Sequence, residues 1–544
     1  MHRLLSGRGI AMKPQPMWAV RQSGLWLLAS GLLLTALSSG AVWFFYSHGW
    51  LLWYGDAEAH LNAARRIVDS ATPGYDQLGT VWLPMLHVLT LPFASVDSLW
   101  RSGLAGSVAP ASGFVAGGVF LFAAAIRIFR SDTAAVAATA LAALNPNMLY
   151  LQSIPMTEGI FFGCLMALLY ASVRFRDTGE WGAVAGAGAA ACLAALTRYD
   201  GWFLIPFAAV YFLWTAGRPQ WPGEKAGWAA ARPWLVALLF TALASLAPLY
   251  WLAHNWYLSG DALDFYRGPY SPAAIQGGKP YPGHGEWAAA FHYYATAVRL
   301  AAGPGVPLMA LGGAVVALAR RVVWPVVLLA LPPAFYIINM HSGASPIFVP
   351  DLWPHSWYNT RYGLAALPLL AFASAALTMA VPRNLRAVTA MLIVIAGGIH
   401  WVIHPQPESW ITWAESRANS AGRRAWMHAA ADYLRPRYVR GSGIVSSGGD
   451  DLFGIYREMG IPLSETFSVF DGLPFVAAEQ RPELWLWQEW AVVKEGDAIQ
   501  RAAARAGYRQ ELKIVEKNEP VVEIYHRTGS PPGDGGLGGN HGSA

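Results

Sequence analysis

Long apolar segments recur through the first three quarters of the chain, and short polar connections separate them. A helix needs roughly 20 apolar residues to cross a hydrocarbon core about 30 Å thick. Eleven segments of about this length occur, at 25–46, 103–126, 133–151, 156–173, 181–197, 201–216, 234–253, 298–319, 322–340, 363–381 and 387–404. The pattern therefore predicts an all-α polytopic membrane domain of about eleven transmembrane helices, with the first segment retained as an anchor.

Basic residues gather in alternate connections, as expected for cytoplasmic loops. Fifteen of them lie before the first span or in the even-numbered connections: Arg3, Arg8, Lys13, Arg21, Arg127, Arg130, Arg174, Arg176, Arg218, Lys225, Arg232, Arg320, Arg321, Arg383 and Arg386. The opposite connection at 152–155 has none. We expect a multi-pass plasma (inner) membrane protein whose N-terminus (1–24) is cytoplasmic and whose chain after His404 is extracytoplasmic.

The apolar segment 80–94 competes for the status of a twelfth span. It contains Pro84 and Pro92, and its length is short for a crossing. A span there would also move every later basic connection to the outer side. We therefore place it in the membrane interface, within a long first outer loop at 47–100.

The composition changes after about residue 405, where charged residues become frequent. Helical patterns occur at 415–434 and 498–506, short strand patterns at 443–447 and 490–494, and a hairpin pattern at 511–515 and 521–526 around Asn518. We expect a small soluble α/β domain at 405–528, following the membrane domain at 25–404. The Gly-rich tail at 529–544 predicts disorder.

Composition agrees with a membrane protein and excludes several other classes. The chain has 544 residues, of which 55% are apolar and 13% charged, about half the charged fraction of a soluble domain. The net charge of +5 comes from basic residues scattered between apolar segments, so no nucleic-acid partner is indicated. The two cysteines lie in apolar segments without metal-binding spacing.

Ionisable residues at the outer ends of spans are costly and mark functional sites. The motif Gly55-Asp56-Ala57-Glu58-Ala59-His60 follows the first span, and Asp56 and His60 share a face if the segment is helical. A loop that simply becomes polar on leaving the membrane is the alternative explanation for Asp56 and His60.

A second group of candidates lies farther along the chain. Glu158 stands at the outer start of the fourth predicted span, where helix capping is an alternative role. Arg198 and Asp200 occupy a short outer turn, and their mutual pairing or a lipid headgroup could also account for the arginine. Arg361 and Tyr362 lie in the segment 353–363 at the outer end of the tenth span. An arginine at such a place can hold a phosphate through two parallel hydrogen bonds.

We expect Asp56, Glu158, Arg198 and Arg361 to meet at one outward-facing cavity. Two carboxylates and two guanidiniums suit transfer of a group from a phosphorylated lipid to an acceptor hydroxyl. A carboxylate takes the proton of the acceptor, and the cations stabilise the departing phosphate.

These residues resemble the GT-C fold glycosyltransferases that use polyprenyl-phosphate sugars, a group that includes protein O-mannosyltransferases and lipid A aminoarabinose transferases. The resemblance covers about the first 400 residues. It depends on the motif at 55–58, the interfacial segment before the second span, Thr157-Glu158 and Leu196-Thr197-Arg198. It implies an integral membrane enzyme of the cell envelope that transfers one hexosyl or pentosyl group with inversion to a glycan, lipid or protein acceptor.

The resemblance also implies roles for individual residues. Asp56 would be the general base, and Glu158 would assist it or share with it a divalent cation such as Mg²⁺ or Mn²⁺. Arg198 or Arg361 would meet the donor phosphate, with Glu58, His60, Asp200 and Tyr362 as further substrate-binding residues. Two departures stand out: Ala57 separates the two acidic residues that are adjacent in relatives, and the WWDYG-type motif of oligosaccharyltransferases is absent.

Two other classes of protein remain as alternatives. A transporter or flippase for a lipid-linked sugar would place ionisable groups near mid-membrane and would have matching halves. A non-catalytic membrane assembly protein would need neither Asp56 nor Glu158. The charges at the outer ends of the spans favour the glycosyltransferase.

Overall fold

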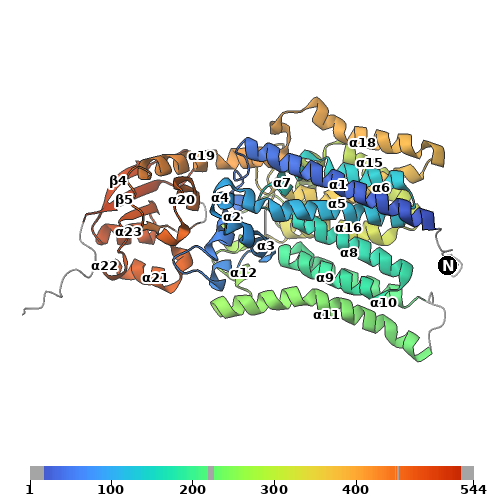
Figure 1. Ribbon diagram of the computed structural model, residues 1–544, viewed down its shortest axis with the longest axis horizontal. Coiled ribbons are helices and arrows are strands. Elements are labelled where there is room, and N and C mark those ends of the chain that lie inside the picture. The colour runs from blue at the N-terminus through green and yellow to red at the C-terminus, as the bar shows by residue number, and fades with distance from the viewer. Residues whose placement is uncertain (1–16, 219–225, 448, 450–451, 529–544) are drawn as a thin grey trace, which may run out of the picture. The chain divides into compact units, whose positions relative to one another are not determined.

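The computed structural model describes residues 17–218, 226–447, 449 and 452–528 (Figure 1). The predicted cytoplasmic segment lies outside the described residues up to position 16, and the predicted tail at 529–544 lies wholly outside them. The chain forms two compact units. We call residues within 1–44, 110–153 and 157–413 the helical unit, and residues within 45–109, 154–156 and 414–544 the α/β unit.

The helical unit consists of long apolar helices. They are α1 (Met17–Ser47, up to residue 44), α5 (Val108–Phe129), α6 (Asp132–Ala143), α7 (Pro146–Ser153), α8 (Glu158–Thr178), α9 (Trp181–Thr197), α10 (Asp200–Ala216), α11 (Ala226–Ser259), α14 (Trp287–Ala302), α15 (Gly305–Ala319), α16 (Val323–His341), α17 (Leu367–Ala376) and α18 (Arg386–Ile403). Helices α8, α9, α10 and α11 pack side by side (Figure 1). Two short helices, α12 (Asp264–Arg267) and α13 (Pro272–Gln276), follow α11.

Every predicted span overlaps one or more helices of the structure. Among the described residues, 7 helices are long and apolar enough to cross a membrane, and 9 spans result if each of two bent pairs counts as one. Helices α9 and α10, with 17 residues each, are shorter than these. A polytopic helical membrane domain is thus confirmed, and the full count of eleven stays a prediction.

Prolines and glycines account for the two bent pairs. Helices α6 and α7 meet at 63°. The first residue of α7 is Pro146, and a proline disfavours helical geometry at the residue that precedes it. Helices α14 and α15 meet at 106° across Gly303, whose φ of +87° suits glycine, and Pro304. The predicted span at 298–319 is therefore wrong as a single helix, because the chain turns sharply at Gly303.

The α/β unit contains a five-stranded mixed sheet in the order β2-β1-β3-β5-β4. The strands are β1 (Ile444–Ser446), β2 (Thr466–Phe467), β3 (Trp490–Lys494), β4 (Tyr508–Ile514) and β5 (Val522–Arg527). Strand β1 pairs in parallel with β2 and β3, whereas β5 pairs antiparallel with β3 and β4. The predicted hairpin is present as β4 and β5, with Asn518 at a φ of +64° in its turn.

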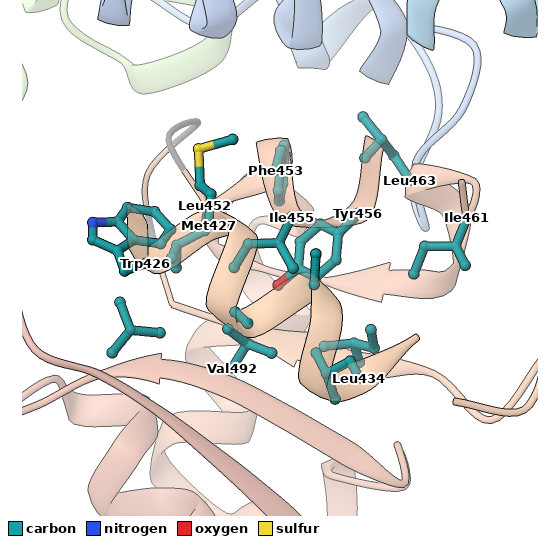
Figure 2. Close-up of a cluster of buried hydrophobic side chains, with 14 of the residues drawn as sticks. Trp426, Met427, Leu434, Leu452, Phe453, Ile455, Tyr456, Ile461, Leu463 and Val492 are labelled. Atoms are coloured by element: carbon teal, nitrogen blue, oxygen red, sulfur yellow. The ribbon is translucent and has the colours of Figure 1, made fainter. Parts of the chain in front are cut away.

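Helices from both ends of the chain share the core of this unit. The first loop contributes α2 (Gly55–Arg66), α3 (Met85–Ala94) and α4 (Asp97–Ser102), and the C-terminal part contributes α19 (Ile411–Leu434), α20 (Phe453–Met459), α21 (Leu473–Gln480), α22 (Pro482–Trp485) and α23 (Ala498–Arg505). Figure 2 shows Trp426 and Leu434 of α19 gathered with Phe453 and Tyr456 of α20. Leu61, Ala64 and Trp100 of the first loop belong to the same buried cluster.

The first loop therefore folds with the C-terminal domain, a division of the chain that differs from the expected boundary at 404.

The apolar segment 80–94 contains helix α3, which has ten residues. Such a helix is about 15 Å long at 1.5 Å per residue, which is half of the length that a membrane crossing needs.

Candidate active site

Five of the predicted site residues line one small cavity in the helical unit. Glu158, Arg198, Asp200, Arg361 and Tyr362 surround a space of about 40 Å³ together with Tyr336 and apolar side chains of α8 and α17. These residues come from four separate segments of the chain: the first turn of α8, the α9–α10 turn, α16, and the 3₁₀ helix Thr360–Ala366. Of the four residues that the sequence analysis expects at one cavity, Glu158, Arg198 and Arg361 line this one. Asp56 belongs to the α/β unit, and its place at the site stays a prediction.

An arginine between two carboxylates forms the centre of this cluster. Arg198 Nη1 donates to Glu158 Oε1 at 2.8 Å and to Thr157 Oγ1 at 2.6 Å. Its Nε lies 3.4 Å from Asp200 Oδ1, and its Nη2 donates to the hydroxyl of Tyr336. The guanidinium thus holds Glu158 and Asp200 in fixed places.

The surroundings keep Arg198 charged. Burial by itself lowers the pKa of its guanidinium, but the Tyr336 hydroxyl and the carboxylates of Glu158 and Asp200 raise it, and the net shift of the pKa is upward. Asp200 is 1% exposed and also accepts a hydrogen bond from the Tyr336 hydroxyl at 3.1 Å. Arg198 is therefore a permanent positive charge with a structural task in the cluster.

Arg361 is the second cation of the cluster and faces the same oxygen of Glu158 as Arg198 does. Its Nε is 3.4 Å from Glu158 Oε1, and its guanidinium lies 5.2 Å from the ring centre of Tyr362. Tyr362 in turn stacks on Tyr336 with ring centres 4.4 Å apart. Asn359, in the left-handed conformation, begins this turn and anchors it by donating to the carbonyl of Pro346.

One oxygen of Glu158 remains available within the cluster. Its Oε1 faces both guanidiniums, whereas its buried Oε2 has no hydrogen-bond partner among the residues that the structure describes. A buried carboxylate oxygen without a donor is costly. Glu158 can therefore accept a hydrogen bond from a group that enters the cavity. A role in helix capping alone would not explain why Oε2 is buried without a hydrogen-bond donor.

A glycine follows three of the site residues and lets their backbones lie close to a neighbouring helix. A Cβ at Gly159 would stand 2.3 Å from the carbonyl oxygen of Pro110 in α5. A Cβ at Gly201 would stand 2.5 Å from the carbonyl carbon of Ala194, and one at Gly363 would stand 2.5 Å from the carbonyl oxygen of Ala297. Small residues permit such contacts between membrane helices. The sequence pairs Glu158-Gly159, Asp200-Gly201 and Tyr362-Gly363 thus help to position the cluster.

The other three predicted site residues belong to the α/β unit. Asp56 is half-buried in the first turn of α2. Glu58 is 1% exposed and accepts hydrogen bonds from Arg457 at 3.0 and 3.1 Å and from Asn62 at 3.2 Å. The role of Asp56 as a base and that of Glu58 in binding stay predictions.

His60 packs against other aromatic side chains within the α/β unit. Its Nδ1 lies 2.9 Å from Nε2 of His87, and its ring lies 4.4 Å from that of Trp82. Burial, followed by the charges of His60 and Arg66, lowers the pKa of His87 well below its usual range. These contacts account for His60 without a substrate, and its binding role is likewise a prediction.

The residues around Glu158 do not fit a divalent cation. Within the described part of the chain, no group of three or more His, Cys, Asp or Glu side chains is arranged to hold a metal ion. Such a cation needs several oxygen ligands, but one oxygen of Glu158 already faces Arg198 and Arg361. The guanidiniums of Arg198 and Arg361, which lie 2.8 and 3.4 Å from Glu158 Oε1, would also repel the ion.

Tyr336 is the residue of the cluster that sequence reasoning missed. It lies in the apolar helix α16, is 4% exposed, and connects Arg198 to Asp200. A tyrosine hydroxyl inside an apolar span needs a hydrogen-bond partner. That requirement is the signal in the sequence that points to it.

Comparison with known proteins supports the predicted resemblance. A family model described as dolichyl-phosphate-mannose-protein mannosyltransferase matches residues 109–251, a segment that includes Glu158, Arg198 and Asp200. No curated protein matches the sequence significantly.

Solved structures match over nearly the whole chain. The crystal structure of ArnT from Cupriavidus metallidurans bound to undecaprenyl phosphate has a TM-score of 0.53 and 14% identity and covers 91% of this chain and 97% of that one. ArnT in the apo state has a TM-score of 0.52 and 12% identity and covers 93% and 98%. The archaeal oligosaccharyltransferase AglB from Archaeoglobus fulgidus, in complex with an inhibitory peptide and a dolichol-phosphate, has a TM-score of 0.41 and 12% identity and covers 92% and 74%. The chain thus has an ArnT-like fold.

Proposed function

We propose that this protein is a membrane glycosyltransferase that transfers a sugar from a polyprenyl-phosphate donor to an acceptor hydroxyl on the extracytoplasmic face of a plasma (inner) membrane. The main support is the buried cluster of Glu158, Arg198, Asp200 and Arg361, on a fold like that of a protein crystallised with undecaprenyl phosphate. The match of the mannosyltransferase family model to residues 109–251 agrees with this class of reaction.

The proposed reaction forms one bond and breaks another at the anomeric carbon of the donor sugar. Asp56 takes the proton of the acceptor hydroxyl, whose oxygen attacks the anomeric carbon from the side opposite the phosphate. The bond between that carbon and the phosphate oxygen breaks, and the electron pair leaves with the polyprenyl phosphate. The configuration of the sugar is inverted.

Arg361 is the better candidate to meet the departing phosphate. Arg198 already uses its nitrogens on Glu158, Thr157, Tyr336 and Asp200, so its role is to position Glu158. Arg361 lines the cavity and is held near it by Glu158. A guanidinium in a dry site stabilises developing phosphate charge strongly. No step of the mechanism runs through a metal, because the donor set around Glu158 does not fit one.

The position of the charges favours transfer over transport. Glu158 begins α8, Arg198 and Asp200 lie at the α9–α10 turn, and Arg361 lies in the 3₁₀ helix before α17. A transporter would carry such groups near the middle of broken helices.

Transfer of label from polyprenyl-phosphate sugars to acceptors in isolated membranes tests the proposal. The wild type is compared with Asp56→Asn, which keeps the size of the side chain and removes the base, and with Asp76→Asn, which changes an exposed aspartate of the same loop. We expect transfer by the wild type and Asp76→Asn, and at least about a hundredfold loss in Asp56→Asn. Equal transfer by Asp56→Asn would exclude Asp56 as the base, and no transfer by any form would contradict the proposed activity.

A further inference from the structure

A second, larger cavity lies wholly within the α/β unit and has no place in the proposed mechanism so far. Its volume is about 410 Å³, within the roughly 300–1,000 Å³ range of small-molecule sites. The first loop lines it with residues that include Trp53 and Glu58, and helices α19 and α20 line it with Arg424, His428, Arg457 and Glu458. The two halves of the unit thus build this cavity jointly.

The shared core of the α/β unit holds the cavity walls in place. The buried cluster of Figure 2 includes Met427 of α19, which also lines the cavity. Arg423, one residue before Arg424, donates to the carbonyl oxygens of Leu52 and Trp53 at 3.2 and 2.8 Å. The cavity therefore has a rigid frame, as binding sites require.

Charges around the cavity balance and occur as donor–acceptor pairs. Glu58 accepts two hydrogen bonds from Arg457, and His428 Nδ1 lies 2.8 Å from Glu458 Oε2. With Arg424, the wall carries two guanidiniums and two carboxylates. A phosphate in the cavity would be repelled by the two carboxylates, and an ammonium group would be repelled by the two guanidiniums. A neutral ligand that carries many hydroxyls can use the donors and the acceptors together.

The indole ring of Trp53 adds an apolar surface to this polar wall. The guanidinium of Arg424 lies 4.0 Å from the ring centre of Trp53. The ring centres of Trp53 and the adjacent Trp50 are 5.6 Å apart. Aromatic rings offer flat apolar area with a polar edge. A sugar ring has the matching properties, since its C–H face is apolar and its rim carries hydroxyl groups.

We propose that the cavity lined by Trp53, Glu58, Arg424, His428, Arg457 and Glu458 is a binding site for a neutral saccharide. If the proposed transferase activity holds, this saccharide is part of the acceptor, which makes the acceptor a glycan or glycolipid. The binding itself does not depend on that activity, so the two proposals can fail separately.

Direct binding of glycans to the full-length protein in lipid nanodiscs tests the proposal. The probes are a panel of neutral di- and trisaccharides, glucosamine as a cationic sugar and glucose 6-phosphate as an anionic one, with saturation-transfer NMR as readout. Arg424→Gln and His428→Gln change the cavity wall. Arg437→Gln is the matched control, because Arg437 stacks on Tyr433 at the same 4.0 Å but does not line the cavity.

We expect at least one neutral saccharide to bind, with affinity reduced about tenfold or more in Arg424→Gln and unchanged in Arg437→Gln. His428 is 61% exposed, so His428→Gln folds even if Arg424→Gln does not, and weaker binding is expected there as well. The proposal is overturned if no neutral saccharide binds, if the charged sugars bind more tightly, or if the wall variants bind like the wild type. Saccharide binding without any sugar transfer would contradict the proposed function and leave this site standing.

Discussion

Replacing Gly159 by alanine is predicted to disturb the candidate active site without touching any of its polar groups. Gly159 follows Glu158 in the first turn of α8, and its Cα faces the backbone of Pro110 in α5. The added Cβ would stand 2.3 Å from the carbonyl oxygen of Pro110 and 3.2 Å from its Cα. Both neighbours are backbone atoms, so no rotation of a side chain can relieve the contact.

The size of the effect follows from the distances. Bringing the Cβ contact from 2.3 Å to the 3.0 Å that real Cβ contacts respect requires the start of α8 to move by about 0.7 Å, and overpacking of this kind costs about 1–3 kcal/mol. A similar displacement would stretch the 2.8 Å bond between Arg198 and Glu158 to the limit of hydrogen bonding, about 3.5 Å. Misplacing a reacting group by about 1 Å lowers the rate about a hundredfold.

Thermal unfolding and sugar transfer of Gly159→Ala and Gly186→Ala test this reasoning. Gly186 lies in the middle of α9 and has no atom within 4 Å of an added Cβ, so its variant should keep wild-type activity and unfold at the same or a slightly higher temperature. Gly159→Ala should unfold at a lower temperature and lose most activity. Wild-type stability and activity in Gly159→Ala would refute the idea that this close approach positions Glu158.

Three further predictions concern single polar groups. Tyr336→Phe removes the hydroxyl between Arg198 and Asp200 and should lower the free energy of unfolding by about 1–3 kcal/mol, as measured by thermal or denaturant unfolding; an unchanged value would contradict the network. Glu58→Ala leaves Arg457 buried without this carboxylate and should lower the free energy of unfolding by about 3–5 kcal/mol. Adding Arg457→Met should restore part of that free energy. If the losses of the two single variants simply add in the double variant, the pair is unimportant. Burial raises the pKa of Asp69, but hydrogen bonds from Ser464 and Arg65 outweigh it, so the folded-state pKa lies below the unfolded one. The stabilisation by Asp69 is therefore present above about pH 4 and lost as pH falls through the folded pKa; Asp69→Asn should lose less stability than the wild type on acidification, and identical pH profiles would argue against this.

Local patterns in the sequence predict most of the helices and several strands. The hydropathy of the spans, the amphipathic period of α19 and the alternation of β4 and β5 are properties of single segments. The sharp turn at Gly303 was missed because a hydropathy window averages across a break. The helical start of α14 was missed because its residues 287–297 include polar and aromatic side chains.

Contacts between distant segments are the part that the sequence does not predict. Glu58 and Arg457 are 399 positions apart, and no period or motif connects them. The same holds for Trp100 and Tyr456, which share one buried cluster. The grouping of Glu158, Arg198 and Arg361 was accessible because the rule for basic loops assigns each of them to the same side of the membrane. Tyr336 is uncharged and lies within a predicted span, so the rule for basic loops does not select it, and only the need of its hydroxyl for a hydrogen-bond partner points to it.

Binding of polyprenyl phosphate to the purified protein in nanodiscs tests the central claim most directly, namely that the cluster around Glu158 receives the donor phosphate. The comparison is between the wild type, Arg361→Gln and Arg174→Gln, whose arginine is exposed near the opposite end of α8 and pairs with Glu180. The account predicts a loss of affinity of about tenfold or more in Arg361→Gln and none in Arg174→Gln. Equal affinity in all three proteins, with Arg361→Gln folded, would contradict it.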